Sequence, residues 1–126
     1  MNIRYYNTYE DDFVESKNQN YKLKDNYKWI KNNIFYKIVA FIVYIPFLIY
    51  GFIYTKLVLK VTFKNKKVLK KYKNYFLYAN HTLEMGDAFN PIVGLFPNKP
   101  YIIVSPSNLG IPVIGRLLPM LGALPI

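Results

Sequence analysis

The chain has 126 residues, enough for one small domain, and combines 52% hydrophobic residues with a formal net charge of +10. It contains no cysteine and a single histidine, which excludes disulfides, cysteine nucleophiles, thiolate metal sites and sites built from several histidines. We therefore expect no metal site and no bound cofactor, and a basic, apolar surface suited to anionic lipid or nucleic acid.

Residues 1–33 form a polar N-terminal arm in which an acidic stretch gives way to lysines. No apolar core follows a basic start, so this arm is not a secretory signal peptide. We expect an irregular or weakly helical arm that lies on a membrane through Tyr21, Tyr27 and Trp29. A solvated tail remains the alternative.

Residues 34–60 are predicted to anchor the chain in a membrane. Residues 38–55 include no charged residue, and this length is at the lower limit for spanning a bilayer core of roughly 30 Å. Pro46 and Gly51 lie inside the run, so a kinked or re-entrant hairpin is an alternative to a straight span. A buried helix of a soluble protein is a further alternative, although so small a domain could hardly cover a helix that is apolar all round.

A cluster of lysines without any acidic residue follows between positions 56 and 73. Beside a membrane segment, each such charge is attracted to anionic lipid by about 1 kcal/mol, and the cluster favours a cytoplasmic location for the following residues. The aromatic and glycine pattern of a single-strand-binding platform is missing, so no nucleic-acid partner is expected. A solvated charge run is the alternative. The membrane-surface group comprises Lys64, Lys66, Lys67, Lys70 and Lys71.

Residues 61–126 are predicted to form an α/β domain. Residues 59–63 alternate between apolar and polar side chains, as an edge strand does, and 75–79 form a continuous apolar run typical of a buried strand. Alternation of strands and helices implies parallel pairing with right-handed crossovers. The other expected strands span 101–104 and 123–126, and the expected helices span 90–96 and 112–121.

The two helices have recognisable ends. Asn90 and Pro91 read as an N-cap and the first helical residue of the first helix. The second helix is expected to direct Val113, Ile114, Leu117 and Leu118 inward and to end at Gly122.

The single histidine, His81, follows the apolar run 75–79, and Asp87 follows it at a short distance. Loops at the carboxyl ends of parallel strands are where ligands bind in open α/β sheets. A histidine there can act as a general base, and a carboxylate can orient its ring and stabilise the imidazolium. Because no serine or cysteine adjoins His81, its proton would come from a substrate hydroxyl. A surface histidine without a catalytic role is the alternative.

Residues 75–126 resemble the start of the catalytic domain of the lysophosphatidic acid (1-acylglycerol-3-phosphate) acyltransferase superfamily. Those enzymes carry an Asn-His, four intervening residues and an Asp, after a buried strand and downstream of a hydrophobic anchor. Asn80, His81 and Asp87 match this motif, and the segment 110–115 resembles the one that precedes a helix later in the family. The resemblance implies a glycerolipid-acyltransferase-like sheet with flanking helices, truncated, behind a membrane helix.

The resemblance also implies an activity in phospholipid biosynthesis at the cytoplasmic face of the cell membrane. His81 would deprotonate the hydroxyl of a lysophospholipid or glycerol phosphate, which would attack the thioester of acyl-CoA or acyl-carrier protein. Asp87 would orient His81, while Asn80 and Thr82 would shape the substrate pocket. Membrane lipid, the acceptor and the acyl donor are the implied partners.

Two departures from the family pattern leave alternatives open. Five residues, instead of four, separate His81 from Asp87, so Gly86 absorbs the extra residue or Glu84 supplies the carboxylate. The family's later motifs, an Arg and a Phe-Pro-Glu-Gly-like run, do not follow, and Arg116 does not replace that Arg. We therefore expect an incomplete catalytic domain. A non-catalytic membrane-surface protein, an inactive fragment or a small subunit of a membrane complex is the alternative.

Overall fold

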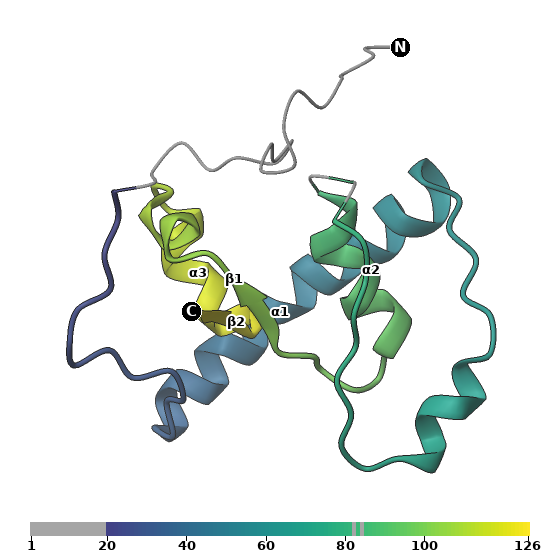
Figure 1. Ribbon diagram of the computed structural model, residues 1–126, viewed down its shortest axis with the longest axis horizontal. Helices are drawn as coiled ribbons and strands as arrows, with labels where there is room; N and C mark the ends of the chain where they lie inside the picture. Colours follow the sequence, from purple (N-terminus) through teal and green to yellow (C-terminus); the bar gives the residue numbers. More distant parts are fainter. Residues whose placement is uncertain (1–19, 82, 84) are drawn as a thin grey trace.

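The computed structural model describes residues 20–81, 83 and 85–126. The described chain combines helices with a small parallel sheet, which confirms the broad α/β class (Figure 1). Its elements are α1 (Ile34–Ile53), a π-helical turn (Tyr54–Val58), a 3-10 helix (Lys66–Lys71), α2 (Gly86–Leu95), β1 (Ile102–Val104), a second 3-10 helix (Pro106–Gly110), α3 (Ile114–Leu121) and β2 (Ala123–Pro125).

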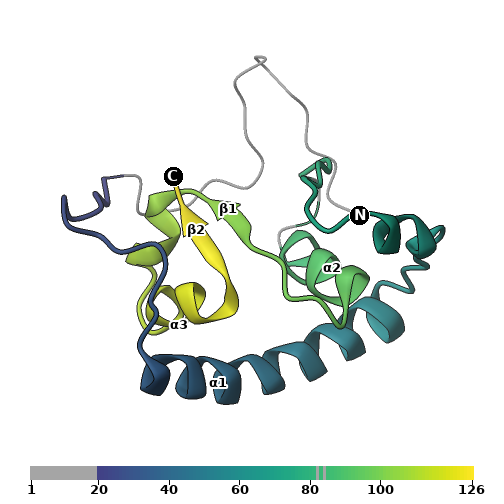
Figure 2. The same ribbon diagram turned by 90° about the horizontal axis from the view of Figure 1, so that it is seen from below.

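The predicted membrane segment forms one continuous helix from Ile34 to Val58, long and apolar enough to cross a membrane. At 1.5 Å per residue its 25 residues extend about 37 Å. The Asn33 side chain caps its start by accepting hydrogen bonds from the backbone N–H groups of Phe35 and Tyr36. Pro46 lies inside the helix without reversing the chain (Figure 2). The hairpin alternative is therefore wrong, because the lost backbone hydrogen bond of one proline does not interrupt so long an apolar helix.

The core lies between α1 and the helices that pack on one side of it. In Figure 2, α3 lies over the N-terminal half of α1 and α2 over its C-terminal half. On the side of α1 that meets them, Ala40 and Gly51 are buried, as is Thr55 in the π-helical turn that continues the helix. A Cβ at Gly51 would lie 2.9 Å from Cδ1 of Phe89, so α2 packs directly on the backbone of α1. Val93 of α2 completes this contact and is almost fully buried.

The C-terminal half of the domain follows the predicted order of strand, helix and strand. β1 and β2 pair in parallel, with Ile102 opposite Ala123, and α3 connects them. Gly122 ends α3 in the left-handed region at a φ of 101°, as predicted, because a residue without Cβ adopts this conformation without strain. The sheet has only these two strands in the described part of the chain, so Ile103 of β1 remains exposed, whereas a buried strand was expected.

Two predicted strands are not formed. Residues 59–63 leave the π-helical turn as an irregular segment, and Lys60 takes a positive φ of 54° that breaks the alternation. Residues 75–79 also lack strand hydrogen bonds, and most of their side chains are exposed, including Phe76 at 87% and Tyr78 at 91%. The physical reason is that a strand requires a hydrogen-bonding partner, which no described segment offers to either run.

Both predicted helices form, but their starts were placed wrongly. α2 begins at Gly86, so Asn90 lies within it, and the Thr55 hydroxyl of the π-helical turn donates to Oδ1 of Asn90 at 3.4 Å. α3 begins at Ile114, and Val113 takes a positive φ of 64° with 73% of its surface exposed. The expectation that Val113 and Ile114 point inward is therefore wrong, since Val113 lies in the turn before α3 and Ile114 is its exposed first residue. Leu117 and Leu118 of the same helix are half-buried.

The described part of the arm, residues 20–33, is irregular and lies against the C-terminal strand. The indole N–H of Trp29 donates to the backbone carbonyl of Pro125 at 2.8 Å. The Tyr27 ring meets the Trp29 ring edge-on, with centroids 5.6 Å apart. Burial, with a smaller contribution from Tyr21, raises the pKa of Tyr27. The arm is thus tied to β2.

Replacing Trp29 with phenylalanine is expected to lower the free energy of unfolding by about 0.5–1.5 kcal/mol, because an aromatic ring remains while the Pro125 carbonyl loses its donor. Thermal unfolding followed by circular dichroism measures this change. Tyr21→Phe is the matched control and should leave the transition unchanged, since Tyr21 is exposed. Equal transitions for Trp29→Phe and the unaltered chain would contradict a stabilising role for this bond.

Candidate active site

His81 and Asp87 are in direct contact. Nδ1 of His81 lies 2.8 Å from Oδ2 of Asp87, so the five intervening residues do not keep the two side chains apart. The same carboxylate oxygen accepts a hydrogen bond from the backbone N–H of Leu83 at 2.8 Å, and the backbone N–H of Asp87 donates to the Leu83 carbonyl at 3.0 Å. This reciprocal pair of bonds winds the loop back, so that the second residue of α2 reaches His81.

Gly86, the first residue of α2, makes the tight loop possible. A Cβ at this position would lie 3.0 Å from Cβ of Leu83 and 3.0 Å from Cδ1 of Leu59. Such contacts are tighter than ordinary van der Waals packing, so a side chain here would push the loop away from its support. The longer spacing between His81 and Asp87 is therefore compatible with their contact because the residue before Asp87 has no side chain.

The environment of the pair differs between the two partners. The Asp87 side chain is 19% exposed and lies in the first turn of α2, where the helix dipole favours a negative charge. The His81 side chain is 55% exposed. When Nδ1–H donates to the carboxylate, Nε2 carries the lone pair that can accept a proton from a bound hydroxyl. A histidine held in this way can act as a general base, with the carboxylate orienting its ring.

The remaining predicted site residues lie around this pair. Asn80 is exposed and directly precedes His81 in an irregular segment. Thr82 and Glu84 lie outside the described residues. Of the two carboxylates considered, the structure therefore brings Asp87 to the imidazole and does not describe Glu84. Arg116 lies on α3, a different element from the histidine loop.

The five lysines of the membrane-surface group are exposed and lie beyond the C-terminal end of α1 (Figure 2). Four of them belong to the 3-10 helix Lys66–Lys71, so they form a compact basic surface. No group of three or more carboxylate or imidazole side chains that could hold a metal ion occurs among residues 20–81, 83 and 85–126.

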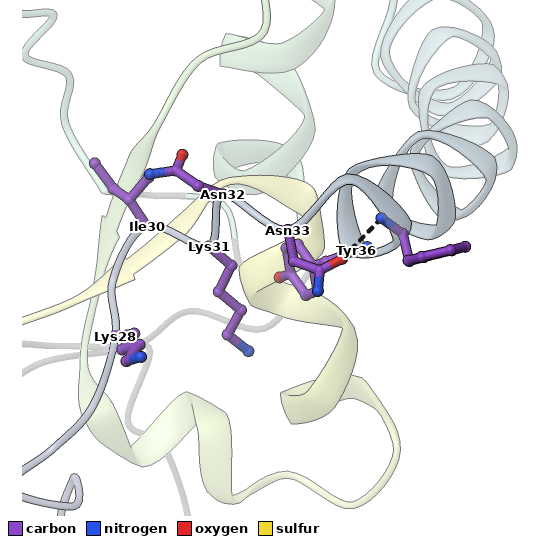
Figure 3. A pocket seen from close by; sticks show the side chains of 7 residues that line it. Lys28, Ile30, Lys31, Asn32, Asn33 and Tyr36 are labelled. Atoms are coloured by element: carbon purple, nitrogen blue, oxygen red, sulfur yellow. Dashed lines mark hydrogen bonds between the residues drawn. The ribbon is translucent and has the colours of Figure 1, made fainter.

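A hollow of about 680 Å³ lies at the junction of the arm and α1, away from the histidine loop (Figure 3). Lys28 and Lys31 line it beside the capped helix start, and neither His81 nor Asp87 contributes to it. It is bounded largely by exposed arm residues, so it is an open depression at the surface and not the place where a substrate meets the imidazole.

Two features near the sheet were not anticipated from the sequence. Ser105 and Ser107 follow β1, and their hydroxyl oxygens are 2.7 Å apart with Ser107 buried. Lys99 lies over the Tyr44 ring of α1, 4.8 Å from its centroid, and donates to the Met120 carbonyl near the end of α3. Burial lowers the pKa of Lys99. The Ser-Pro-Ser sequence directly after a strand could have indicated the contact between the two serines. No local sequence pattern indicates the contacts of Lys99.

No protein-family model, curated protein or solved structure matches the chain. The fold and the site define a mixed α/β chain that has one helix apolar enough to cross a membrane and an imidazole–carboxylate pair at the start of α2. Any more specific assignment rests on the residues themselves.

Proposed function

We propose that this chain is a glycerolipid acyltransferase, with residues 75–126 corresponding to the start of the catalytic domain. The reaction is the transfer of a fatty acyl group from acyl-CoA or acyl-carrier protein to the hydroxyl of a lysophospholipid or glycerol phosphate. The observation that carries the proposal is the 2.8 Å contact between His81 Nδ1 and Asp87 Oδ2. The Asn80-His81 sequence and the apolar helix upstream of it also support the proposal.

The residues suit direct transfer onto an alcohol. His81 Nε2 takes the proton of the acceptor hydroxyl while that oxygen attacks the thioester carbonyl. When the tetrahedral intermediate collapses, the C–S bond breaks and the imidazolium returns the proton to the leaving thiolate. The products are an ester and a free thiol, so atoms and charge balance. Asp87 stabilises the transient imidazolium.

The finer fold in this proposal is a glycerolipid-acyltransferase-like sheet within residues 61–126. The parallel pairing of β1 with β2 across α3 supports this fold, whereas the run 75–79 forms no strand in the structure.

The surroundings of the pair are assigned roles that fit the same reaction. Asn80 and Thr82 shape the substrate pocket, and the exposed lysines hold the site at an anionic membrane and collect phosphate-bearing acceptor. The catalytic part faces the cytoplasm, because the lysine cluster lies between it and the apolar helix.

The experiment that tests the proposal compares the two candidate carboxylates. Membranes containing the full-length protein are supplied with a lysophospholipid and acyl-CoA, and formation of the diacyl product is measured. Asp87→Asn is expected to reduce the rate by about 10²–10⁴-fold, because the amide orients the imidazole wrongly and cannot stabilise its charge. Glu84→Gln is the matched control and should retain activity. The reverse result would show that Glu84 is the orienting carboxylate.

A further inference from the structure

The side of α1 that faces away from α2 and α3 is an uninterrupted apolar surface. In a soluble protein the outward side of a helix is polar, whereas the outward side of α1 consists of large apolar residues. Its inward side includes the buried residues Ala40 and Gly51 and the half-buried rings of Tyr44 and Phe52, which contact Lys99 and Phe96. We use the term outer face for the exposed residues Ile38, Phe41, Ile42, Ile45, Ile49 and Ile53.

Such a surface requires an apolar partner, and the charges at its two ends indicate the chemistry of that partner. No charged residue occurs between 38 and 55, while Lys31 and Lys37 precede the outer face and Lys56 and Lys60 follow it, all of them exposed. An apolar surface of this size with cations at both ends is complementary to the acyl chains and anionic headgroups of a lipid leaflet. Length alone would equally allow α1 to cross the whole bilayer.

The elements packed on α1 decide between these two orientations. They cover the inward side along the whole helix, from α3 near its start to α2 near its end (Figure 2). Lys99 lies over Tyr44, close to the middle of α1, and the irregular segment after α2 approaches there with it. If α1 crossed the bilayer, this lysine and non-helical backbone would lie near the bilayer centre, where both are strongly unfavourable.

We propose that α1 lies in the plane of the membrane, with its outer face inserted into one leaflet and α2, α3 and the sheet on the aqueous side. The insertion would be about 5–10 Å deep, as for other interfacial helices. Lys99 and the α2 and α3 backbones then stay at or above the headgroups, and the lysines at both ends of α1 reach the same anionic surface. This orientation stands independently of the acyltransferase proposal.

The sidedness of the two ends of α1 provides the test. The natural chain has no cysteine, so single cysteines can be introduced without removing any. Asn32→Cys precedes α1 and Lys64→Cys follows it, and both positions are exposed. Sealed vesicles of phosphatidylcholine and anionic phosphatidylglycerol carrying the full-length protein are treated from outside with a membrane-impermeant maleimide. The cysteine-free chain measures background labelling.

Both cysteines are expected to react to the same extent from the same side. Labelling of one cysteine only from outside and the other only after the vesicles are opened would establish a crossing helix and overturn the proposal. Recovery of the protein away from the vesicles would overturn it equally. Neither readout depends on enzymatic activity, so a failed acyltransferase assay leaves this result intact.

The depth of the outer face provides a second readout. Fluorophores are attached at Ile38→Cys, Ile45→Cys and Ile53→Cys and quenched by lipids that carry nitroxides at known depths. A helix in the membrane plane predicts equal, shallow depths at the three positions. A label at Ile45 that lies deepest, with both end labels near the headgroups, would show that α1 crosses the bilayer.

Discussion

Replacing His81 with alanine is expected to reduce acyl transfer by about 10²–10⁴-fold, the usual contribution of a general base. The loss follows from the proposed reaction, in which no other group near the acceptor hydroxyl takes its proton. Because the His81 side chain is more than half exposed, the substitution should change the free energy of unfolding by less than about 0.5 kcal/mol. Product formation and thermal unfolding are measured on the same full-length protein in membranes and in detergent, respectively.

Arg116→Ala is the control for the His81 substitution. Arg116→Ala removes another exposed polar side chain and should leave the rate unchanged, because Arg116 lies on α3 away from the histidine loop. Undiminished activity of His81→Ala would rule out His81 as the base. In that case the exposed lysines become the better candidates for function, and charge reversal at Lys64, Lys66 and Lys67 should disrupt it as expected of a non-catalytic membrane-surface protein.

Replacing Gly115 with alanine is expected to destabilise the domain by about 1–3 kcal/mol. Alanine in a helix ordinarily stabilises it relative to glycine by roughly 0.8–1.0 kcal/mol, so the expected sign is opposite to the helix propensity. The reason is steric, since a Cβ on Gly115 would overlap the backbone carbonyl of Leu109 in the preceding 3-10 helix. Backbone at a close contact yields less readily than a flexible side chain.

Thermal or denaturant unfolding of the full-length protein in detergent measures this effect. Arg116→Ala serves again as the matched control, because it lies one position further along α3 and is exposed. A higher transition temperature for Gly115→Ala would show that α3 does not pack on the 3-10 helix as closely as the structure has it. That result would leave the His81 prediction unaffected, since the two sites lie on different elements.

Several elements follow from local sequence because their signals are local. The start of α1 is capped by Asn33, and the apolar run of residues 38–55 specifies a long helix whatever surrounds it. The turn at Gly122 and the strand after it were predicted correctly, since a glycine with a positive φ ends a helix through its own backbone freedom. Parallel pairing of β1 with β2 follows from the intervening helix.

The strands predicted at 59–63 and 75–79 show where local reasoning fails. Both patterns suit a strand, but strand formation depends on a partner elsewhere in the chain, and the described residues place none beside them. The predicted start of α2 was wrong for a related reason. The reciprocal bonds between Leu83 and Asp87 begin the helix earlier than the Asn-Pro signal indicates.

The candidate site also has one part that is visible in the sequence and one part that depends on tertiary packing. The Asn-His sequence and the nearby aspartate are visible in the sequence, but their spacing left two carboxylates to choose from. The contact between His81 and Asp87 depends on the loop wound over Gly86, which in turn depends on Leu59 beyond the end of the apolar helix. That support joins segments well separated along the chain, so no local pattern reveals it.

By itself, the sequence determined that an uncharged helix of membrane length lies next to a basic cluster and that the single histidine is followed closely by an aspartate. Only the tertiary structure decided which side of that helix is packed and which side stays exposed. An all-apolar helix has no polar stripe to mark its outer side, so the distinction arises from the packing of α2 and α3 on Ala40, Gly51 and Thr55. The position of Lys99 beside the middle of α1 is equally a product of packing, because it joins residues remote in sequence.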